Sequence, residues 1–368
     1  MKILEIIPQL SQGGAERFVI DLCNELANGG HEVTLVVLHS IERTGFFAKE
    51  VDPKVRLVSM NKRMGMDWSL FFRLARLIRR EKPDAVHTHL RGIVYSLLAF
   101  VRPSKTRFIH TVHSDAAKEA GEGVSKWCRK MAFGYKRVHP VTISDESQRS
   151  FSEFYHLPST LIYNGRPPYQ VGDGVEDAAA DLQAAKTNKE AKIIVNVARI
   201  QAAKNQLALA KAVDSLNQRG HAVELAIIGR KDAAISAQIE ALGSPFVHLL
   251  DTRPNPRDYM RAADAFCLSS AWEGMPITLI ECFSVGALPL CTPVGGIVDM
   301  IRDGENGILA KSPAQNDLEE MIERFLGLSD AEAAKMRAAS AASFARYDMT
   351  QCAKNYIRLI EELRNSNR

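Results

Sequence analysis

The stretch KIIVNVARIQAAKNQLALAKAVDSLNQRGHAVELAII, residues 192–228, is the part of the chain that decides the fold prediction. It begins with the apolar run Lys192–Val197 and ends with the apolar run Glu224–Ile228. Such runs form strands that are buried on both faces of a parallel sheet. Between them, apolar residues recur at helical spacing over Gln206–Arg219. The stretch therefore predicts two parallel strands joined by a crossover helix.

The same alternation of strand and helix continues on both sides of this unit. Further strands are predicted at Ile3–Ile7, Glu32–Leu38, Ala85–Thr88, Arg107–Thr111, Pro140–Ile143, Val247–Leu250, Ala265–Leu268 and Leu288–Cys291. Helices are predicted at Ala15–Ala27, Leu70–Arg80, Lys126–Phe133, Ala234–Ala241, Ile277–Val285 and Thr350–Arg364. Residues 170–191 are rich in alanine and charge, which indicates a linker with one short helix.

This order predicts an α/β protein of two doubly wound, Rossmann-like domains that face each other across a cleft. The expected domains are residues 1–166 and 192–349, with residues 167–191 as a linker or hinge region. The sequence leaves open whether the final helix, about 350–368, packs back on the first domain. A chain of 368 residues, 46% of them hydrophobic, suffices for two cores. Ligands are expected at the carboxyl ends of the strands.

Composition and apolar runs limit where the protein is expected to be located and what it is expected to bind. The six cysteines are scattered without metal-ligand spacing, so we expect buried, reduced thiols. The apolar run at the amino terminus is too short for a signal peptide, and no stretch reaches the ~18 apolar residues of a membrane span. The expected location is therefore the cytoplasm. No recognition motif for nucleic acid occurs, and no nucleic-acid partner is expected.

Charge is unevenly distributed along the chain. Residues 1–165 hold 24 Lys and Arg against 17 Asp and Glu, whereas the remainder holds 23 against 26. Two interpretations stay open: ordinary solvated helix faces, or peripheral contact of the first domain with anionic lipid headgroups or a lipid-linked acceptor. Two basic groups at roughly helical spacing stand out, namely Arg73, Arg76, Arg79, Arg80 and Lys82, and Lys126, Arg129, Lys130, Lys136 and Arg137.

Candidate ligand-binding groups follow two of the predicted strands. Gly13 and Gly14 stand between the first strand and the first helix, where the backbone can approach a ligand at the helix N-terminus. Arg199 and Lys204 follow the strand Lys192–Val197. An Arg can bind two phosphate oxygens at once and a Lys adds a point charge, so the pair would neutralise a diphosphate leaving group. A pair of solvated loop cations is the alternative.

The most specific group is EGMPITLIE, residues 273–281, which follows the strand Ala265–Leu268 and opens a helix. Carboxylates at its two ends could accept hydrogen bonds from vicinal hydroxyls of a sugar and a ribose. First-turn amides between them point at phosphate, and Pro276, which has no amide hydrogen, suits a first helical turn. Two surface glutamates are the alternative interpretation. It is weakened because Glu281 lies in an apolar run, where an acid needs a partner.

Taken in this order, the motifs resemble those of retaining glycosyltransferases of family 4, which have the GT-B fold. The resemblance covers nearly the whole chain. It rests on the Glu273–Glu281 motif, on Arg199 with Lys204, and on the segments Gly13–Glu16, Gly30–Val33, Thr111–Ser114, Tyr163–Gly165, Thr292–Gly296 and Asp303–Gly307.

The resemblance implies a role for each matching residue. Arg199 and Lys204, with the Gly14 amide, would hold the donor diphosphate, and Glu281 would bind the ribose. Glu273 and nearby amides would hold sugar hydroxyls and phosphate, and His113 would contact the donor sugar. The implied catalytic set is His113, Glu273, Arg199 and Lys204. The donor-binding set adds Gly13, Gly14, Gly229, Gly274, Met275, Pro276, Ile277 and Glu281, and the hinge set is Asn164 and Gly165.

The implied reaction moves a hexose or N-acetylhexosamine from a nucleotide diphosphate sugar, with a UDP-sugar favoured, to a glycan or lipid-linked acceptor in surface polysaccharide biosynthesis. Retention would follow from front-face attack, in which the leaving phosphate assists deprotonation of the acceptor. No cofactor and no metal are expected, because the chain has no D-x-D triplet. His87 and His89 share a strand face, but nothing in the sequence places His110 or His113 beside them.

Three other functions stay open: a nucleotide-sugar epimerase on the same fold, a non-catalytic nucleotide-sugar-binding subunit, and a dinucleotide oxidoreductase. The last is the weakest, because no G-x-G-x-x-G follows any predicted strand. Two positions depart from the family pattern. Asp251 stands where a glycine is usual, in the loop over the nucleotide base, and His113 is followed by Ser114 and Asp115 rather than by a second histidine.

Overall fold

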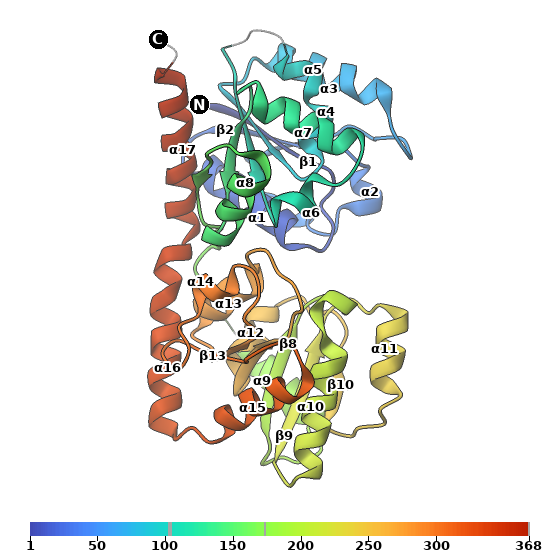
Figure 1. The fold of residues 1–368 in the computed structure, drawn as a ribbon, viewed down its shortest axis with the longest axis vertical. Helices are drawn as coiled ribbons and strands as arrows, with labels where there is room; N and C mark the ends of the chain where they lie inside the picture. The colour runs from blue at the N-terminus through green and yellow to red at the C-terminus, as the bar shows by residue number, and fades with distance from the viewer. Residues whose placement is uncertain (102–104, 173, 367–368) are drawn as a thin grey trace. The chain divides into compact units, whose positions relative to one another are not determined.

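The computed structural model describes residues 1–101, 105–172 and 174–366. By its internal contacts the chain divides into two compact units. Unit 1 holds Met1–Pro167 and Arg346–Arg368, and unit 2 holds Pro168–Ala345. Each unit is built on one parallel sheet with helices packed against it (Figure 1).

Unit 1 has a seven-stranded sheet within the described residues, in the order β3-β2-β1-β4-β5-β6-β7, with every neighbouring pair parallel. Its strands are β1 Lys2–Ile7, β2 Glu32–Val37, β3 Arg56–Ser59, β4 Ala85–His89, β5 Arg107–Val112, β6 His139–Thr142 and β7 Thr160–Leu161. Its helices are α1 Gly14–Asn28, α2 Ile41–Thr44, α3 Trp68–Glu81, α4 Gly92–Tyr95, α5 Leu97–Phe100, α6 Ala116–Ala120, α7 Val124–Gly134, α8 Asp145–Tyr155 and α17 Met349–Asn365, with a 3-10 turn at Ala48–Glu50.

Local sequence explains where the helices of unit 1 begin and end. The Asp67 carboxylate accepts a hydrogen bond from the Leu70 amide and caps α3, which ends at Lys82 in a left-handed conformation (φ 47°) just before Pro83. Ser144 caps α8 through a capping box with Ser147. The apolar faces of these helices pack against strand residues that are buried on both faces of the sheet.

Unit 2 has a six-stranded parallel sheet within the described residues, in the order β10-β9-β8-β11-β12-β13. Its strands are β8 Lys192–Val197, β9 Val223–Ile228, β10 Val247–Leu249, β11 Ala265–Leu268, β12 Pro289–Cys291 and β13 Ile308–Leu309. Its helices are α9 Gly174–Ala185, α10 Gln206–Gln218, α11 Ala233–Glu240, α12 Pro256–Ala262, α13 Ile277–Val285, α14 Ile297–Met300, α15 Gln315–Leu326 and α16 Asp330–Ser343, with 3-10 turns at Ala202–Lys204 and Phe344–Tyr347, the second reaching into unit 1.

The two sheets share one topology, and the predicted α/β class with two doubly wound units is confirmed. In each, the first strand lies in the interior of the sheet and the chain reverses its direction of growth there, between β1 and β4 in unit 1 and between β8 and β11 in unit 2. In open α/β sheets, ligands bind outside the carboxyl ends of the strands at this switch point. The topology alone therefore selects the loops after β1, β4, β8 and β11.

The region between the predicted domains contains one helix, as the sequence indicates. Residues 174–185 form α9, whose buried Ala178 and Leu182 help it to pack on α12 within unit 2. The final helix, α17, packs on α1 and β5 of unit 1 (Figure 1). All six cysteines are buried and unpaired, as expected. Among the described residues, no helix combines the length and the apolar character that crossing a bilayer requires.

Candidate active site

The switch point of unit 2 brings Lys204 and Glu273 into contact. β8 and β11 are hydrogen-bonded neighbours, so the loops that follow them meet at the carboxyl edge of the sheet. Lys204 Nζ lies 2.6 Å from Glu273 Oε1, and the Ser270 hydroxyl donates to the same oxygen at 2.6 Å. Glu273 is 7% exposed. Because an ammonium group has three N–H donors, this contact orients Lys204 and leaves donors for an anionic ligand.

Arg199 lies at the same edge, with an exposed side chain. Its main-chain carbonyl accepts a hydrogen bond from Gln206 Nε2 at 3.0 Å, which fixes the loop after β8. Within the described ranges, no hydrogen bond or ion pair of its guanidinium occurs with protein groups, so the structure does not join Arg199 to the Lys204–Glu273 pair. An exposed guanidinium on a fixed loop suits contact with a ligand that arrives from solvent.

Two glycines let neighbouring loops close against these residues. Gly229, directly after β9, has φ 156°, and a Cβ there would lie 1.9 Å from the carbonyl oxygen of Ala198. Gly295 has φ 53°, and a Cβ there would lie 2.1 Å from the carbonyl oxygen of Glu273. Neither position admits a side chain without displacing backbone. Gly229 thus has a packing role beside the loop of Arg199.

The other predicted donor-binding residues of unit 2 surround the start of α13. Gly274 accepts a hydrogen bond at its carbonyl oxygen from the Gly296 amide at 2.8 Å. Met275 and Ile277 are buried, and Pro276 is the N-cap residue, so α13 begins at Ile277. Glu281 lies one turn into α13 and is 6% exposed. Glu273 and Glu281 thus flank a helix N-terminus, whose amides and dipole favour an anion.

The backbone conformation of Asp251 explains how an aspartate can stand where the family pattern has a glycine. Its φ of 56° is left-handed, a conformation that glycine adopts freely and aspartate tolerates better than most residues. Its carbonyl oxygen accepts from the Gly229 amide at 3.0 Å, and its carboxylate lies 3.2 Å from Lys231 Nζ. The loop therefore keeps the backbone conformation that a glycine would give.

At the carboxyl edge of unit 1, Gly13 and Gly14 lie at the N-terminus of α1, which begins at Gly14, one residue before the predicted start. Gly13 is the N-cap residue and Gly14 is exposed. The Glu16 carboxylate folds back toward Gly13, where an added Cβ would lie 2.4 Å from Glu16 Oε2, and it accepts from the Ser11 hydroxyl at 2.9 Å. A carboxylate already occupies part of this helix N-terminus, so any phosphate here would lie beside Glu16.

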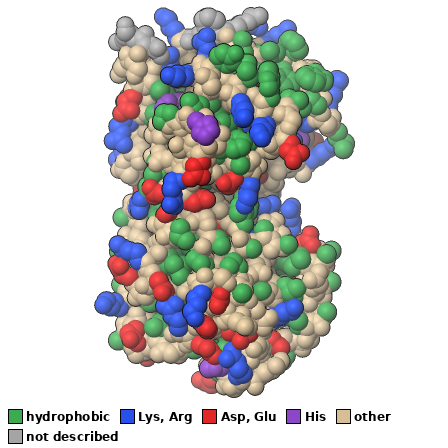
Figure 2. All heavy atoms as spheres, viewed as in Figure 1, with side chains coloured by type: hydrophobic (Ala, Val, Ile, Leu, Met, Phe, Trp, Pro, Cys, Tyr) green, Lys and Arg blue, Asp and Glu red, His purple; other side chains and the backbone are tan. Residues whose placement is uncertain are grey.

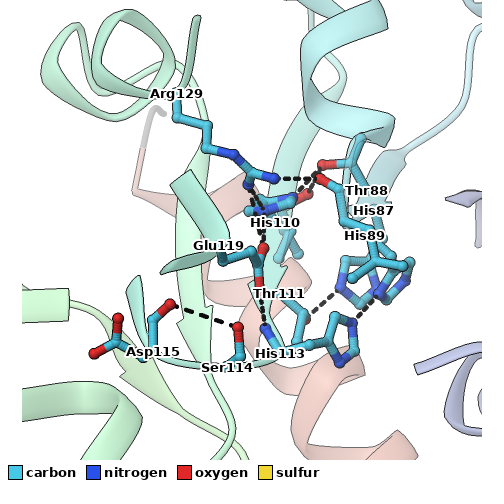
Figure 3. Close-up of polar contacts among 12 residues, drawn as sticks. His87, Thr88, His89, His110, Thr111, His113, Ser114, Asp115, Glu119 and Arg129 are labelled. Carbon is cyan, nitrogen blue, oxygen red and sulfur yellow. Dashed lines mark hydrogen bonds and ion pairs between the residues drawn. The ribbon is translucent and has the colours of Figure 1, made fainter. Parts of the chain in front are cut away.

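His113 lies at the same edge of unit 1 and contacts His89 of β4, a neighbour that could not be assigned from the sequence (Figure 3). His113 Nε2 lies 2.9 Å from His89 Nδ1. Glu5 Oε2 lies 2.8 Å from His89 Nε2 and 3.0 Å from His87 Nδ1. His87 and His89 do share a strand face, and Glu5 reaches both because the parallel register pairs it with His87.

His110 faces the opposite side of the sheet and belongs to a second buried cluster (Figure 3). Arg129 donates to His110 Nε2 at 2.8 Å and to Glu119 Oε1 at 3.2 Å. Glu119 Oε2 accepts from the main-chain amide of His113 at 2.6 Å. Arg129, 2% exposed, is therefore not part of a basic surface, and that part of the sequence interpretation was wrong. Since a guanidinium only donates, His110 is neutral with its proton on Nδ1, directed at Thr88.

The electrostatics of this edge favour neutral imidazoles between ionised carboxylates. Burial lowers the pKa of His110 and of His113 to about 4, and it lowers the pKa of His89 well below its usual range. Burial raises the pKa of Glu119, but the positive charge of Arg129, which donates to this carboxylate at 3.2 Å, outweighs burial and the pKa falls to about 2. His89, His110 and His113 are therefore neutral at pH 7.

Glu5, His87 and His89 form the single group among the described residues whose ligand atoms, all within 4.8 Å of one another, could hold a metal ion. Their facing atoms are already paired at hydrogen-bond distances of 2.8 and 3.0 Å. Carboxylate oxygens and imidazole nitrogens are suitable zinc ligands, but the same atoms satisfy one another completely as donors and acceptors.

The predicted hinge residues lie where both chain crossings leave unit 1. The Arg166 amide donates to the Tyr347 carbonyl at 2.9 Å, and the Met349 amide donates to the Arg166 carbonyl at 3.0 Å. A Cβ on Gly165 would lie 2.8 Å from Met349 Cα, so the two crossing segments touch through backbone. Asn164 is buried, and its Oδ1 has no hydrogen-bond partner among the described residues.

Sequence reasoning missed Glu5, Glu119 and Ser270. One signal was present for Glu5: it stands alone in the apolar strand KILEII, and a buried acid needs a partner. Glu119 gave no comparable signal, because it lies in a short polar stretch. The family pattern has a second histidine after His113, where this chain has Ser114 and Asp115. Asp115 has a local structural role, because its carboxylate caps α6 by accepting a hydrogen bond from the Lys118 amide at 2.8 Å.

The chain matches two family models: Glycosyltransferase Family 4 over residues 12–168 and Glycosyl transferases group 1 over residues 177–342. It is 23% identical over 377 residues, spanning all of both chains, to a Campylobacter jejuni GalNAc-alpha-(1->4)-GalNAc-alpha-(1->3)-diNAcBac-PP-undecaprenol alpha-1,4-N-acetyl-D-galactosaminyltransferase. It is 22% identical to an Escherichia coli UDP-Gal:alpha-D-GlcNAc-diphosphoundecaprenol alpha-1,3-galactosyltransferase, over 89% of this chain and 87% of the relative.

Among solved structures, Anabaena Alr3699/HepE in complex with UDP superposes with a TM-score of 0.81 at 17% identity, over 98% of this chain and 100% of the other. Sucrose-phosphate synthase from Thermosynechococcus elongatus also gives 0.81, at 16% identity and 99% coverage of both chains. At such identities the likeness establishes the fold, and the family models together span both units. The chain belongs to the group 1 and family 4 glycosyltransferases and is a glycosyltransferase with the GT-B fold.

Proposed function

We propose that this glycosyltransferase uses a nucleotide diphosphate sugar, with a UDP-sugar favoured, and transfers a hexose or N-acetylhexosamine with retention of configuration. The observation that carries the proposal is the contact of 2.6 Å between Lys204 and Glu273 at the switch point of unit 2. It sets an oriented cation for phosphate beside a buried carboxylate for sugar hydroxyls. The start of α13 adds amides directed at the same place.

In this mechanism the residues of unit 2 bind and neutralise the donor. Lys204 and Arg199 stabilise the negative charge that grows on the leaving diphosphate as the glycosidic bond breaks. Glu273 accepts hydrogen bonds from sugar hydroxyls, and Glu281 accepts from the ribose. The acceptor hydroxyl attacks the anomeric carbon on the face that the phosphate leaves: the new carbon–oxygen bond forms as the bond to the phosphate breaks. The leaving phosphate takes the proton of that hydroxyl, so no side chain acts as a nucleophile or a base.

We also propose that the reaction needs no metal ion. Two cations at the edge of unit 2 supply the charge that a divalent ion would otherwise supply to the diphosphate. Donor turnover should therefore persist in EDTA. Complete loss of turnover in EDTA, restored by Mg²⁺ or Mn²⁺, would contradict this.

The proposed acceptor is a glycan on a lipid carrier. Two relatives carry diphosphoundecaprenol-linked sugars in their names, and a third, from Staphylococcus aureus, is named for capsular polysaccharide biosynthesis at 22% identity. These are properties of the relatives, and they motivate polyprenyl diphosphate-linked oligosaccharides as the first acceptors to assay.

A titration of UDP in EDTA tests the donor site separately from the acceptor. The variants are Lys204→Met, which removes the proposed phosphate contact, and Lys211→Met, which removes an exposed lysine on α10 as a matched control. Wild type and Lys211→Met should bind UDP alike, and Lys204→Met should bind about tenfold or more weakly, since a charge-assisted hydrogen bond contributes about 1.5–3 kcal/mol. Equal affinities in all three would remove Lys204 from the site.

We further propose that unit 1 contacts anionic lipid through a surface defined by α3 and α5. Figure 2 shows hydrophobic side chains gathered over the part of unit 1 where Figure 1 labels these helices. Trp68 and Phe72 on α3 are 66% and 69% exposed. A groove of about 1220 Å³ lies beside them, and its lining includes Phe72, Leu98, Arg76, Arg79, Lys82, Lys105 and Arg107. Exposed aromatics among cations are typical of surfaces that lie in a lipid interface.

Vesicle sedimentation tests this surface. Wild type should bind vesicles that contain phosphatidylglycerol at low salt and should dissociate as salt screens the cations. A Trp68→Ser and Phe72→Ser double variant should bind less, whereas the same changes at Trp127 and Tyr135, exposed on or next to α7, should matter less. Absence of binding at low salt would refute the surface.

A further inference from the structure

We propose that Glu5 positions His113 by fixing the proton of the intervening His89, so that His113 presents an unprotonated Nδ1 to the substrate. The inference rests on the proposed function in one respect, that His113 faces bound sugar. The hydrogen-bond chain itself lies wholly within unit 1, and Figure 3 shows its outer part, where the ring of His113 meets His89.

The first step concerns Glu5, which lies in the middle of β1 and is 1% exposed. Burial raises the pKa of this carboxyl, but the neighbouring imidazoles of His87 and His89 outweigh burial and lower it to about 2. An ionised carboxylate can only accept hydrogen bonds. The nitrogens that face it, His87 Nδ1 and His89 Nε2, must therefore both carry protons.

The second step passes this constraint to His113. A neutral imidazole carries one proton, so His89, protonated at Nε2, has a lone pair at Nδ1. His113 Nε2 lies 2.9 Å from that lone pair and must donate to it. The proton of His113 is thus held on Nε2, and its Nδ1 is a hydrogen-bond acceptor. No group among the described residues donates to this Nδ1.

The other arm of the chain locks Glu5 in place. The Thr111 hydroxyl lies 2.7 Å from His87 Nε2 and 2.8 Å from the Tyr356 hydroxyl. In the neutral ring, the single proton of His87 is the one on Nδ1 and its Nε2 is an acceptor, so that Thr111 donates to Nε2 and Tyr356 donates to Thr111. Every proton in this arm has one acceptor, and the arm ends on α17. If every hydrogen bond of this arm changed direction, the Tyr356 proton would need a new acceptor. If the hydrogen bonds of the His89 arm changed direction, the His113 proton would only move to Nδ1, which has no partner to lose.

A second carboxylate holds the main chain of His113 from the opposite side of the sheet. Glu119 accepts the His113 amide at 2.6 Å and is itself held by Arg129. The ring and the backbone of His113 are therefore oriented by two buried acids, Glu5 and Glu119. His113 can accept a hydrogen bond from a substrate hydroxyl and cannot act as a cationic acid near neutral pH.

The test is ¹⁵N NMR of the histidine rings, which distinguishes protonated from unprotonated ring nitrogens without any substrate. In wild type at pH 7.5, His113 should be protonated at Nε2 and unprotonated at Nδ1, with His89 in the same tautomer. In Glu5→Gln, the amide NH₂ would face an imidazole N–H, which it cannot donate to. We expect His89 to move its proton from Nε2 to Nδ1 and to donate it to His113 Nε2, so that the His113 proton moves to Nδ1. In Tyr356→Phe, which removes only the far end of the other arm, His113 should stay as in wild type.

Several results would overturn the inference. A wild-type His113 protonated at Nδ1 contradicts it even if Glu5→Gln does not fold. An unchanged His113 tautomer in a folded Glu5→Gln removes Glu5 as the positioning residue. Stoichiometric zinc in the purified protein, with His89 Nε2 unprotonated, would replace the hydrogen-bond chain by a metal site.

Kinetics connect the tautomer to the reaction. Glu5→Gln should lower kcat/KM of transfer about tenfold, as expected when an acceptor at the substrate is replaced by a donor, while Tyr356→Phe changes it less than threefold. UDP affinity, which depends on unit 2, should be unchanged in both variants. If wild type does not bind UDP, the proposed donor site is refuted while the tautomer result stands. Failure of the proposed function and failure of this inference are therefore distinguishable. A reversed tautomer with unchanged kcat/KM would show that His113 Nδ1 does not face the substrate.

Discussion

Lowering the pH from 7 to 5 should destabilise unit 1 strongly, because several of its histidines are neutral in the fold. His110 and His113 have pKa values of about 4, against an ordinary value near ~6.5 in an unfolded chain. Between these values the unfolded chain binds more protons than the folded one. Stability is therefore full above about pH 6.5 and falls as the pH falls toward 4.

The size of the effect follows from the same two values. Between pH 7 and pH 5 each ring removes about 2 kcal/mol of stability, so the pair removes about 4 kcal/mol. That is a large part of the ~5–15 kcal/mol that stabilises a typical domain. His89 acts in the same direction, since burial lowers its pKa as well. Glu5 and Glu119, with pKa values of about 2, add further loss only as the pH falls below about 4.5.

Urea unfolding read by pulse proteolysis and mass spectrometry measures the two units separately. Peptides from β4 and β5 should lose protection at a markedly lower urea concentration at pH 5 than at pH 7. Unit 2 should lose less stability at pH 5, because its two histidines, His221 and His248, are partly exposed. His110→Gln should reduce the pH dependence of unit 1 by about 2 kcal/mol. A loss under about 1 kcal/mol in unit 1 would refute the neutral state of these rings.

Three further predictions concern unit 2. Lys204→Ala and Glu281→Ala should each lower donor turnover at least about tenfold in a nucleotide-release assay, and unchanged rates in both would remove the site assignment. Gly229→Ala should destabilise unit 2 by about 3 kcal/mol or more in urea, because the added Cβ would meet the Ala198 carbonyl; a wild-type midpoint would show that the loop after β9 yields. Asp251→Ala should lower stability by about 1 kcal/mol and Asp251→Asn by less than about 0.5, since asparagine tolerates the left-handed backbone; equal effects on thermal unfolding would contradict this.

Local patterns predicted most of the strands and the helices between them. The stretch 192–228 folds as β8, α10 and β9 within one residue of the expected bounds, because continuous apolar runs and helical spacing have few other solutions. Helices such as α8, α9 and α12 were not assigned or only partly assigned. Their weaker or shorter apolar faces become helical through capping and packing on neighbours, as α9 does on α12.

Contacts between side chains distant in sequence were harder to predict. The Lys204–Glu273 contact depends on β8 and β11 being neighbours, which follows from the strand order and not from either motif alone. Arg129 fits the spacing of a solvated helix face, and only the positions of Glu119 and His110 make its burial favourable. Glu5 gave a signal of burial but none of its partners, because the register that pairs it with His87 forms between strands 82 residues apart.

The central claim is that the edge of unit 2 formed after β8 and β11 binds and activates a nucleotide-sugar donor. The most direct measurement is nucleotide release from UDP-, GDP- and ADP-sugars in EDTA, by wild type and by Lys204→Ala. We expect wild type to hydrolyse one donor slowly without acceptor, with a UDP-sugar favoured, and Lys204→Ala to do so at least about tenfold more slowly. Release of free nucleotide from no donor, together with no thermal stabilisation by any of them, would contradict the claim.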